Sequence, residues 1–178
     1  TTGRRRALGQ HFLRDPHTAR SIVDLASLTK NDLAVEIGPG TGALTGLLSE
    51  AAGRLLLLEI DENLLKRLKA KFARSSNIEY THADARQYPF IELRHLRPGA
   101  SGRVVVVGNL PYSVSKPILF RLIEARAHGP DDSRQLQSAV VGSSGHRPGR
   151  DAYKFGLAQS LRAALFQLDR QRQRLALL

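Results

Sequence analysis

The sequence predicts an α/β fold in which parallel strands form a doubly wound sheet with helices on both faces. The first observation is a strand, a glycine-rich loop and a helix in direct succession over residues 33–52, which is the opening unit of such a sheet. The second is the run Leu55–Leu58, which lacks the polar alternation of a half-exposed strand and is typical of a parallel strand covered on both faces. The third is a series of polar residues that follow successive strands and would meet at one edge.

Length and composition favour one basic domain. The chain has 178 residues, of which 42% are hydrophobic, enough for one good core. It carries 27 Lys and Arg against 16 Asp and Glu, a net charge of +11. Such a balance favours a polyanionic partner, nucleic acid first, although a basic surface also serves solubility alone.

Several classes of protein are disfavoured by composition. The absence of cysteine excludes disulfides, thiolate metal sites and thiol nucleophiles. The six histidines are scattered and show no zinc pattern. There is no apolar stretch of membrane-spanning length and no N-terminal signal. We therefore expect a soluble, cytoplasmic protein without a metal.

The N-terminal residues 1–14 are basic, and Arg4–Arg6 are either a solvated tail or an arm that contacts phosphates. Asp15 and Pro16 then predict a helix start, with aspartate as the N-cap and proline at the first helical position. The expected buried stripe of that helix consists of Ile22, Val23, Leu25 and Ala26.

A strand over residues 33–37 leads into the glycine loop Gly38–Gly42, and a helix is expected over residues 43–52. Glycines let the backbone approach a ligand closely, and a helix start offers free N–H groups. Gly38, Gly40 and Ala43 satisfy a loose G-x-G-x-x-A dinucleotide pattern. A tight turn without a ligand remains the alternative.

The second strand, over residues 54–60, places Glu59 at its carboxyl end, where an acidic side chain can accept both hydroxyls of a ribose. Asp61 or Glu62 would then cap a helix that runs through Phe72. The outer face of this helix is either solvated or in contact with RNA. Its cations are Lys66, Arg67, Lys69 and Lys71.

The third strand, over residues 77–81, precedes Asp84, which is either a helix N-cap or an acceptor for an adenine amino group. The fourth strand, over residues 103–108, delivers the loop Asn109–Tyr112, and a helix follows over residues 115–127. A polar amide, a proline-fixed backbone and an aromatic ring in one loop suit a planar base with an exocyclic amine.

Together these motifs closely resemble the ribosomal RNA adenine N6-dimethyltransferases, in the order and at about the spacing of that family. The motifs are Gln10–Leu13, Val35–Thr45, Glu59–Asp61, Asp84–Ala85 and Asn109–Tyr112. The resemblance implies a Rossmann-like, S-adenosyl-L-methionine-dependent methyltransferase fold. It also implies the cofactor contacts: His11 and Leu13 through an N-terminal lid, Gly38 in the pocket wall, Glu59 on the ribose, Asp84 on the adenine, and Asn109 beside the methyl donor.

The resemblance implies that Asn109, Leu110, Pro111 and Tyr112 are catalytic. An adenine amine is a poor nucleophile because its lone pair is delocalised into the ring. Hydrogen bonds to the Asn109 side-chain oxygen and to a carbonyl near Leu110 would favour a tetrahedral nitrogen whose lone pair faces the methyl group. Tyr112 would stack on the base, which must leave its helix to reach the pocket.

The family pattern stops after about Gly129. We therefore divide the chain into a basic arm and lid (1–14), a Rossmann-like methyltransferase core (15–128) and a divergent or truncated segment (129–178), with the C-terminal helical domain absent or truncated. In this last segment only Ala139–Val141 suggests a short strand. A truncated or frame-altered product is one hypothesis that accounts for the pattern.

The leading functional hypothesis is N6-dimethylation of two adjacent adenines near the 3' end of small-subunit ribosomal RNA, a step of rRNA processing and ribosome biogenesis. The expected partner of this RNA-binding, monomeric protein is the small ribosomal subunit. Three alternatives stay open: a resistance-type methyltransferase of large-subunit RNA, a non-catalytic ribosome-assembly factor, and a nicotinamide-dependent oxidoreductase. The oxidoreductase accounts for the glycine loop but not for Asn109–Tyr112.

Overall fold

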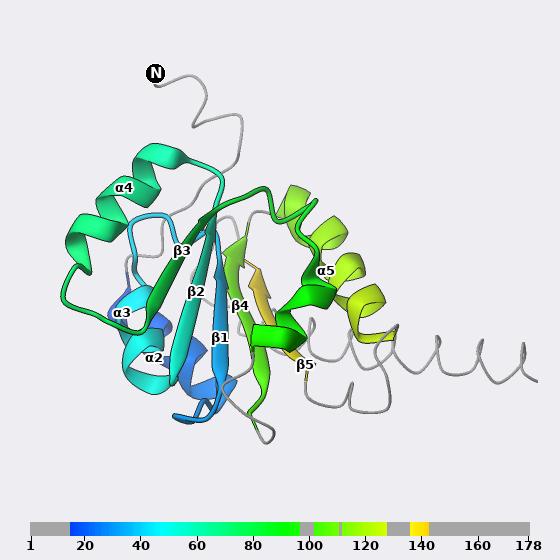
Figure 1. Cartoon of the computed structure of the whole chain (residues 1–178), viewed down its shortest axis with the longest axis horizontal. Helices are drawn as coiled ribbons and strands as arrows, with labels where there is room; N and C mark the ends of the chain where they lie inside the picture. The colour runs from blue at the N-terminus through cyan, green and yellow to red at the C-terminus, as the bar shows by residue number, and fades with distance from the viewer. Residues whose placement is uncertain (1–14, 97–101, 111, 128–135, 143–178) are drawn as a thin grey trace, which may run out of the picture.

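The computed structural model of the chain describes residues 15–96, 102–110, 112–127 and 136–142. Within these residues a five-stranded sheet has the order β3-β2-β1-β4-β5, and every neighbouring pair of strands is parallel (Figure 1). The elements are α2 (Pro16–Ala26), β1 (Leu33–Ile37), α3 (Thr45–Ala51), β2 (Arg54–Glu59), α4 (Glu62–Lys71), β3 (Ile78–His82), the 3₁₀ helix η1 (Phe90–Leu96), β4 (Val104–Leu110), α5 (Tyr112–Ala127) and β5 (Leu136–Gly142).

The strand order reverses between β1 and β4. From β1 the chain moves outward through β2 to β3, and it then returns to the other side of β1 to form β4 and β5. Such a switch point leaves a crevice outside the carboxyl ends of the two strands. The glycine loop after β1 and the end of β4 therefore lie next to each other.

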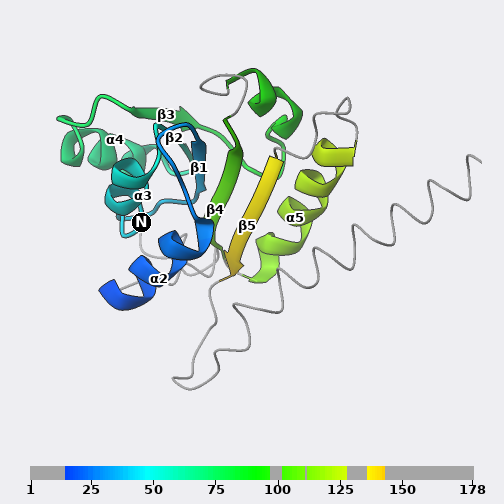
Figure 2. The same ribbon diagram turned by 90° about the horizontal axis from the view of Figure 1, so that it is seen from below.

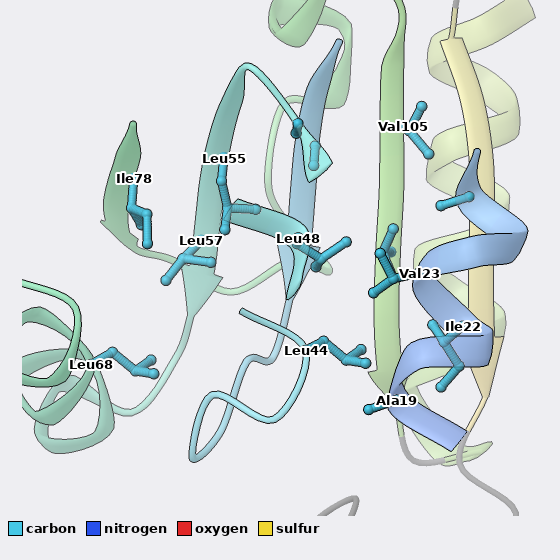
Figure 3. Close-up of a cluster of buried hydrophobic side chains, with 14 residues drawn as sticks. Ala19, Ile22, Val23, Leu44, Leu48, Leu55, Leu57, Leu68, Ile78 and Val105 are labelled. Atoms are coloured by element: carbon cyan, nitrogen blue, oxygen red, sulfur yellow. The ribbon is translucent and has the colours of Figure 1, made fainter. Parts of the chain in front are cut away.

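Two hydrophobic cores lie on opposite faces of the sheet, because successive side chains of each strand point to opposite sides. Helices α2, α3 and α4 cover one face and α5 covers the other (Figure 2). Leu55 and Leu57 belong to the core under α2, α3 and α4 (Figure 3), and Leu56 and Leu58 belong to the core under η1 and α5. The prediction that this run is covered on both faces is confirmed.

Helix α2 begins as the sequence predicts but buries a narrower stripe. The Asp15 carboxylate accepts hydrogen bonds from the backbone N–H groups of His17 and Thr18, each at 3.1 Å. The expectation that Leu25 is buried is wrong, since this side chain is 58% exposed. Leu25 lies about 110° around the helix axis from the centre of the stripe at the helical repeat. The buried residues are Ala19, Ile22, Val23 and Ala26.

The expected loop over Asn109–Tyr112 is largely regular structure. Strand β4 continues through Leu110 because β5 pairs with it beyond the end of β1, with Asn109 opposite Val141. Helix α5 starts at Tyr112, three residues earlier than predicted. Strand β5 is longer than the three residues that the sequence suggested, and it carries the sheet beyond residue 128. The division of the chain into core and C-terminal segment stays a prediction.

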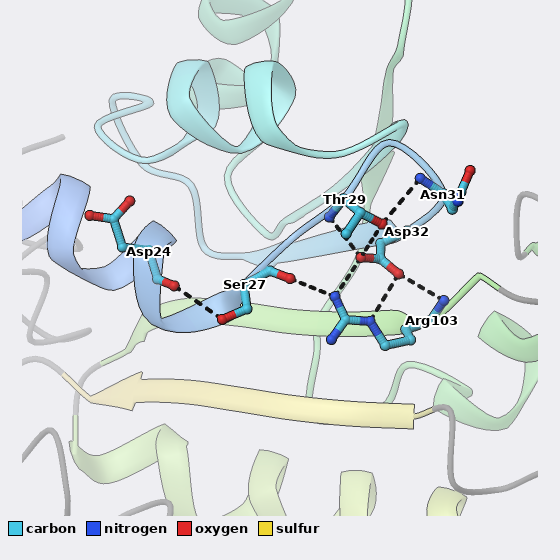
Figure 4. A network of polar contacts seen from close by, with 6 residues as sticks. All are labelled: Asp24, Ser27, Thr29, Asn31, Asp32 and Arg103. Carbon is cyan, nitrogen blue, oxygen red and sulfur yellow. Dashed lines mark hydrogen bonds and ion pairs between the residues drawn. The ribbon is translucent and has the colours of Figure 1, made fainter.

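An ion pair links the residues just before β1 and β4, at the edge of the sheet opposite the glycine loop (Figure 4). Asp32, just before β1, is 1% exposed. Its carboxylate accepts hydrogen bonds from the Nε (3.0 Å) and Nη2 (2.6 Å) of Arg103, just before β4, and from the N–H and hydroxyl of Thr29. Arg103 also donates to the carbonyl of Ser27 at 2.6 Å. The Arg103 guanidinium holds the pKa of Asp32 well below its usual range.

Candidate functional site

A pocket lies at the carboxyl edge of the sheet, at the switch point between β1 and β4. Its walls come from the loop after β1, the ends of β2 and β4, the turn after β3 and the first turns of α5. The sequence-predicted site residues that the structure brings together in this pocket are Gly38, Glu59, Asp84, Asn109 and Leu110. They come together because the carboxyl ends of parallel strands share one edge.

The glycine loop has a backbone shape that other residues rarely adopt. Gly38, Gly40 and Gly42 have φ values of 64°, 58° and 82°, in the left-handed region where a side chain is strained. The Gly38 N–H donates to the carbonyl of Leu58 in β2, and the Gly42 N–H donates to the carbonyl of Pro39, both at 2.9 Å. The first bond continues the pairing of β1 with β2, and the second closes a turn within the loop.

Residues at the C-terminal end of α4 contact this loop. A Cβ on Gly42 would lie 2.8 Å from Cε2 of Phe72 and 2.9 Å from Cδ2 of Leu68, closer than real carbon contacts allow. The Lys71 ammonium donates to the carbonyl of Thr41 at 2.9 Å. The third glycine is thus required for packing against α4 as well as for its φ angle.

Glu59 is held by backbone N–H groups. Its side chain is buried, and the residue is 2% exposed. Oε1 accepts from the N–H groups of Ile60 (2.9 Å) and Asp61 (3.0 Å), and Oε2 accepts from the N–H of Gly40 (3.2 Å). Because a carboxylate oxygen accepts about two hydrogen bonds, Oε2 retains capacity for a hydroxyl in the pocket.

Asp84 heads a tight turn after β3 rather than a long helix. Its carbonyl accepts from the Gln87 N–H at 2.9 Å. Its Oδ1 accepts from the Arg86 N–H at 2.9 Å, and the Arg86 guanidinium reaches both carboxylate oxygens. The hydrogen bonds from the Arg86 side chain lower the pKa of Asp84, so Asp84 is ionised at neutral pH. Sequence reasoning did not single out Arg86.

The end of β4 contributes Asn109 and Leu110 with different roles. Asn109 is half-buried and lines the pocket, whereas the Leu110 side chain is buried in the core under α5. A Cβ on Gly38 would lie 3.5 Å from Cδ2 of Leu110, so the leucine packs beneath the glycine loop. Of the remaining predicted residues, His11, Leu13, Pro111 and the side chain of Tyr112 lie outside the described residues.

A buried carboxyl group that sequence reasoning missed also reaches the pocket. Glu36, one residue before the end of β1, is 2% exposed, and its Oε2 accepts from the Thr45 hydroxyl at 2.7 Å. Burial raises the pKa of Glu36 to about 7. The hydrogen bond joins the strand before the glycine loop to the first residue of α3 after it. The signal in the sequence is an acidic residue inside an otherwise apolar strand.

The residues present fit the adenosine part of S-adenosyl-L-methionine, which the motif resemblance implies. Glu59 and Asp84 offer acceptors for the hydroxyl and amino donors of a nucleoside, and Ile60, Ala85 and Leu110 add apolar wall to the same pocket. Within the described ranges, no group of three or more His, Cys, Asp or Glu could hold a metal ion. No helix in this part of the chain is long and apolar enough to cross a membrane.

Comparison with known proteins agrees with this geometry. Residues 2–155 match the family described as ribosomal RNA adenine dimethylase. The chain is 39% identical over 149 residues to a ribosomal RNA small subunit methyltransferase A from Aromatoleum aromaticum, covering 84% of this chain and 53% of that protein. It is 40% identical over 138 residues to the protein of the same name from Coxiella burnetii, covering 77% and 51%. The chain thus spans about half the length of these curated relatives.

Solved structures share the fold. The 23S rRNA methyltransferase ErmE superposes with a TM-score of 0.60 at 28% identity, over 74% of this chain and 48% of that one. A dimethyladenosine transferase from Plasmodium falciparum superposes with a TM-score of 0.57 at 26% identity, over 74% and 43%. These similarities confirm the predicted Rossmann-like methyltransferase fold.

Proposed function

Because the chain belongs to the ribosomal RNA adenine dimethylase family, as its motifs predicted, we propose that it transfers methyl groups from S-adenosyl-L-methionine to N6 of adenines in small-subunit ribosomal RNA. The observation that carries this proposal is the pocket at the switch point. There Glu59 and Asp84 stand at the ends of neighbouring strands, and Asn109 stands across the glycine loop from them. Asn109 adds a side-chain amide oxygen to this pocket, which can accept from the amine of a substrate adenine.

In this proposal, residues at the ends of β1, β2 and β3 would hold the cofactor. Oε2 of Glu59 accepts a ribose hydroxyl, because Gly40 occupies only part of its acceptor capacity. Asp84 accepts from the adenine amino group, and the glycine loop at Gly38 brings backbone rather than side chains against the ligand. When bound, S-adenosyl-L-methionine supplies the methyl group.

The substrate adenine is oriented by the end of β4. The Asn109 side-chain oxygen and the carbonyl of Leu110 accept the two protons of the amine, which turns its lone pair out of the ring system and toward the donor. The Leu110 side chain packs in the core and beneath Gly38, so it fixes this carbonyl relative to the glycine loop. Positioning and electrostatics therefore supply the rate enhancement. The stacking role of Tyr112 and the contribution of Pro111 stay predictions.

The proposed substrate is a pair of adjacent adenines near the 3' end of the small-subunit RNA. The net charge of +11 supports a polyanionic partner, and the names of the relatives point to the small subunit. A monomeric state, a cytoplasmic location and the cofactor contacts of His11 and Leu13 belong to the same proposal and rest on the sequence alone.

The decisive experiment incubates the chain with labelled S-adenosyl-L-methionine and immature small ribosomal subunits, and then maps the N6-methylated adenines. Asn109→Ala should reduce transfer at least about a hundredfold, the scale seen when an oriented hydrogen-bonding group is removed. It should leave the affinity for S-adenosyl-L-homocysteine within about threefold, because Asn109 acts mainly on the substrate in this scheme. Asn63→Ala, which changes an exposed asparagine on α4, is the matched control.

Each alternative has its own outcome in this assay. Full transfer by Asn109→Ala would refute the role of Asn109. Methylation confined to large-subunit RNA would favour the resistance-type enzyme. Binding to the small subunit without transfer would favour a ribosome-assembly factor, and binding of a nicotinamide dinucleotide in place of S-adenosyl-L-homocysteine would overturn the proposal.

A further inference from the structure

The carboxylate of Asp84 is already engaged inside the pocket by Arg86. The Arg86 backbone N–H donates to Oδ1 at 2.9 Å, Nε lies 3.0 Å from both Oδ1 and Oδ2, and Nη2 donates to Oδ2 at 2.6 Å. Both residues line the pocket. Their side chains are 20% and 50% exposed, so the pair sits at the rim of the pocket rather than in the core.

These contacts engage both oxygens of the Asp84 carboxylate. Arg86 supplies three N–H donors, and because its Nε–H is shared between Oδ1 and Oδ2, each oxygen faces two of them. A carboxylate oxygen accepts about two hydrogen bonds. Glu59 differs, since its Oε2 accepts only from the Gly40 N–H. A ribose hydroxyl can therefore add to Oε2 of Glu59 without displacing a group, whereas an adenine amino group must compete with the Arg86 guanidinium for the oxygens of Asp84.

We propose that Arg86 competes with the cofactor adenine for Asp84 and so sets how strictly the pocket selects a base with an exocyclic amino group. This inference rests on the proposed function. Asp84 alone presents only acceptors to the exocyclic position and so disfavours a carbonyl there in place of the amine, because two acceptors would face each other. The Arg86 guanidinium supplies donors to such a carbonyl. Arg86 therefore weakens binding of adenine and also weakens discrimination against the oxo base.

The test measures binding by isothermal titration calorimetry, with the 178-residue chain and two ligands. One ligand is S-adenosyl-L-homocysteine, and the other is S-inosyl-L-homocysteine, in which a carbonyl replaces the amino group. In Arg86→Leu the Kd for the adenosyl ligand should fall about two- to fivefold, the range expected for loss of a partly exposed competing ion pair. The ratio of the inosyl to the adenosyl Kd should rise about tenfold or more.

Two further variants separate charge and geometry. Arg67→Leu removes the same charge from an exposed position on α4 and should change neither Kd. Arg86→Lys keeps the charge but loses the forked, two-point contact, so its Kd ratio should lie between those of the wild type and Arg86→Leu. It also tests the inference if the leucine variant fails to fold.

The outcomes distinguish this inference from the proposed function. If the wild-type chain binds the adenosyl ligand and Asp84→Asn weakens that binding, but substitution of Arg86 changes neither Kd nor their ratio, the competition is refuted and the proposed function stands. A higher adenosyl Kd in Arg86→Leu would also refute it, since Arg86 would then support the base. If the wild-type chain binds neither ligand, both proposals fail.

Discussion

Replacing Gly42 by alanine tests two requirements of the glycine loop: a left-handed backbone at this position, and close packing against the residues at the end of α4. The φ angle of Gly42 is 82°, where an L-residue is strained. Its added Cβ would lie 2.8 Å from Cε2 of Phe72 and 2.9 Å from Cδ2 of Leu68. Leu68 is buried in the core under α2, α3 and α4, so it cannot move aside without opening a void.

Two costs add in the Gly42→Ala variant. Holding a residue with a side chain in the left-handed region costs about 1–2 kcal/mol. Forcing a carbon into a filled site typically costs about 1–3 kcal/mol. The sum is about 2–5 kcal/mol, a large part of the roughly 5–15 kcal/mol by which a domain is stable. Because Thr41 of the same loop lines the pocket, affinity for S-adenosyl-L-homocysteine should also fall.

Urea unfolding followed by circular dichroism measures this cost, with Gly46→Ala as the matched control. Gly46 lies in α3, and its added Cβ would be 3.6 Å from Cε1 of the same Phe72 ring, an ordinary contact. That variant should gain up to about 1 kcal/mol because alanine favours the helix. In a Phe72→Leu background, Gly42→Ala should lose the part of its steric cost that comes from the ring, and keep the contact with Leu68 and the backbone strain.

Either of two results would contradict these costs. A loss of less than about 0.5 kcal/mol for Gly42→Ala, the level of an ordinary surface substitution, would show that the loop relaxes freely. An equal loss with Phe72 and with leucine at that position would show that contact with the ring contributes nothing.

Two further predictions concern buried carboxyl groups. Asp32→Asn should reduce the free energy of unfolding by about 2–4 kcal/mol at neutral pH, because Arg103 loses its charged partner. The folded-state pKa of Asp32 is depressed below 3.8, so this difference should shrink in urea titrations below that pH; a pH-independent difference would contradict it. Glu36 has a folded-state pKa raised from 4.5 to about 7, so wild-type stability should fall as pH rises through that interval, by up to roughly 3 kcal/mol. Glu36→Gln should abolish this slope, and parallel curves for the two proteins would refute the assignment.

Local patterns in the sequence were sufficient for the first three strands, the glycine loop and the general position of the site. Apolar runs without alternation require cover on both faces, and the Leu55–Leu58 run received it from two cores. The positions of Gly38, Glu59 and Asp84 in one pocket also followed from the sequence, because parallel strands end at a common edge. The family followed from the order and spacing of the motifs.

Contacts between distant residues decided the rest. Asp32 and Arg103 are separated by 71 positions, and no local pattern pairs them. Asn109 became part of a strand because β5 extends the ladder past β1.

Within the site, the sequence by itself determined which residue types stand at the carboxyl edge, because periodicity and glycine positions are local properties of the chain. Only the tertiary structure decided how their acceptors are used: Glu59 keeps capacity on Oε2, and the Asp84 oxygens are taken by Arg86. The reason is that side-chain rotamers and hydrogen-bond partners depend on packing around the pocket, which spacing along the chain does not encode.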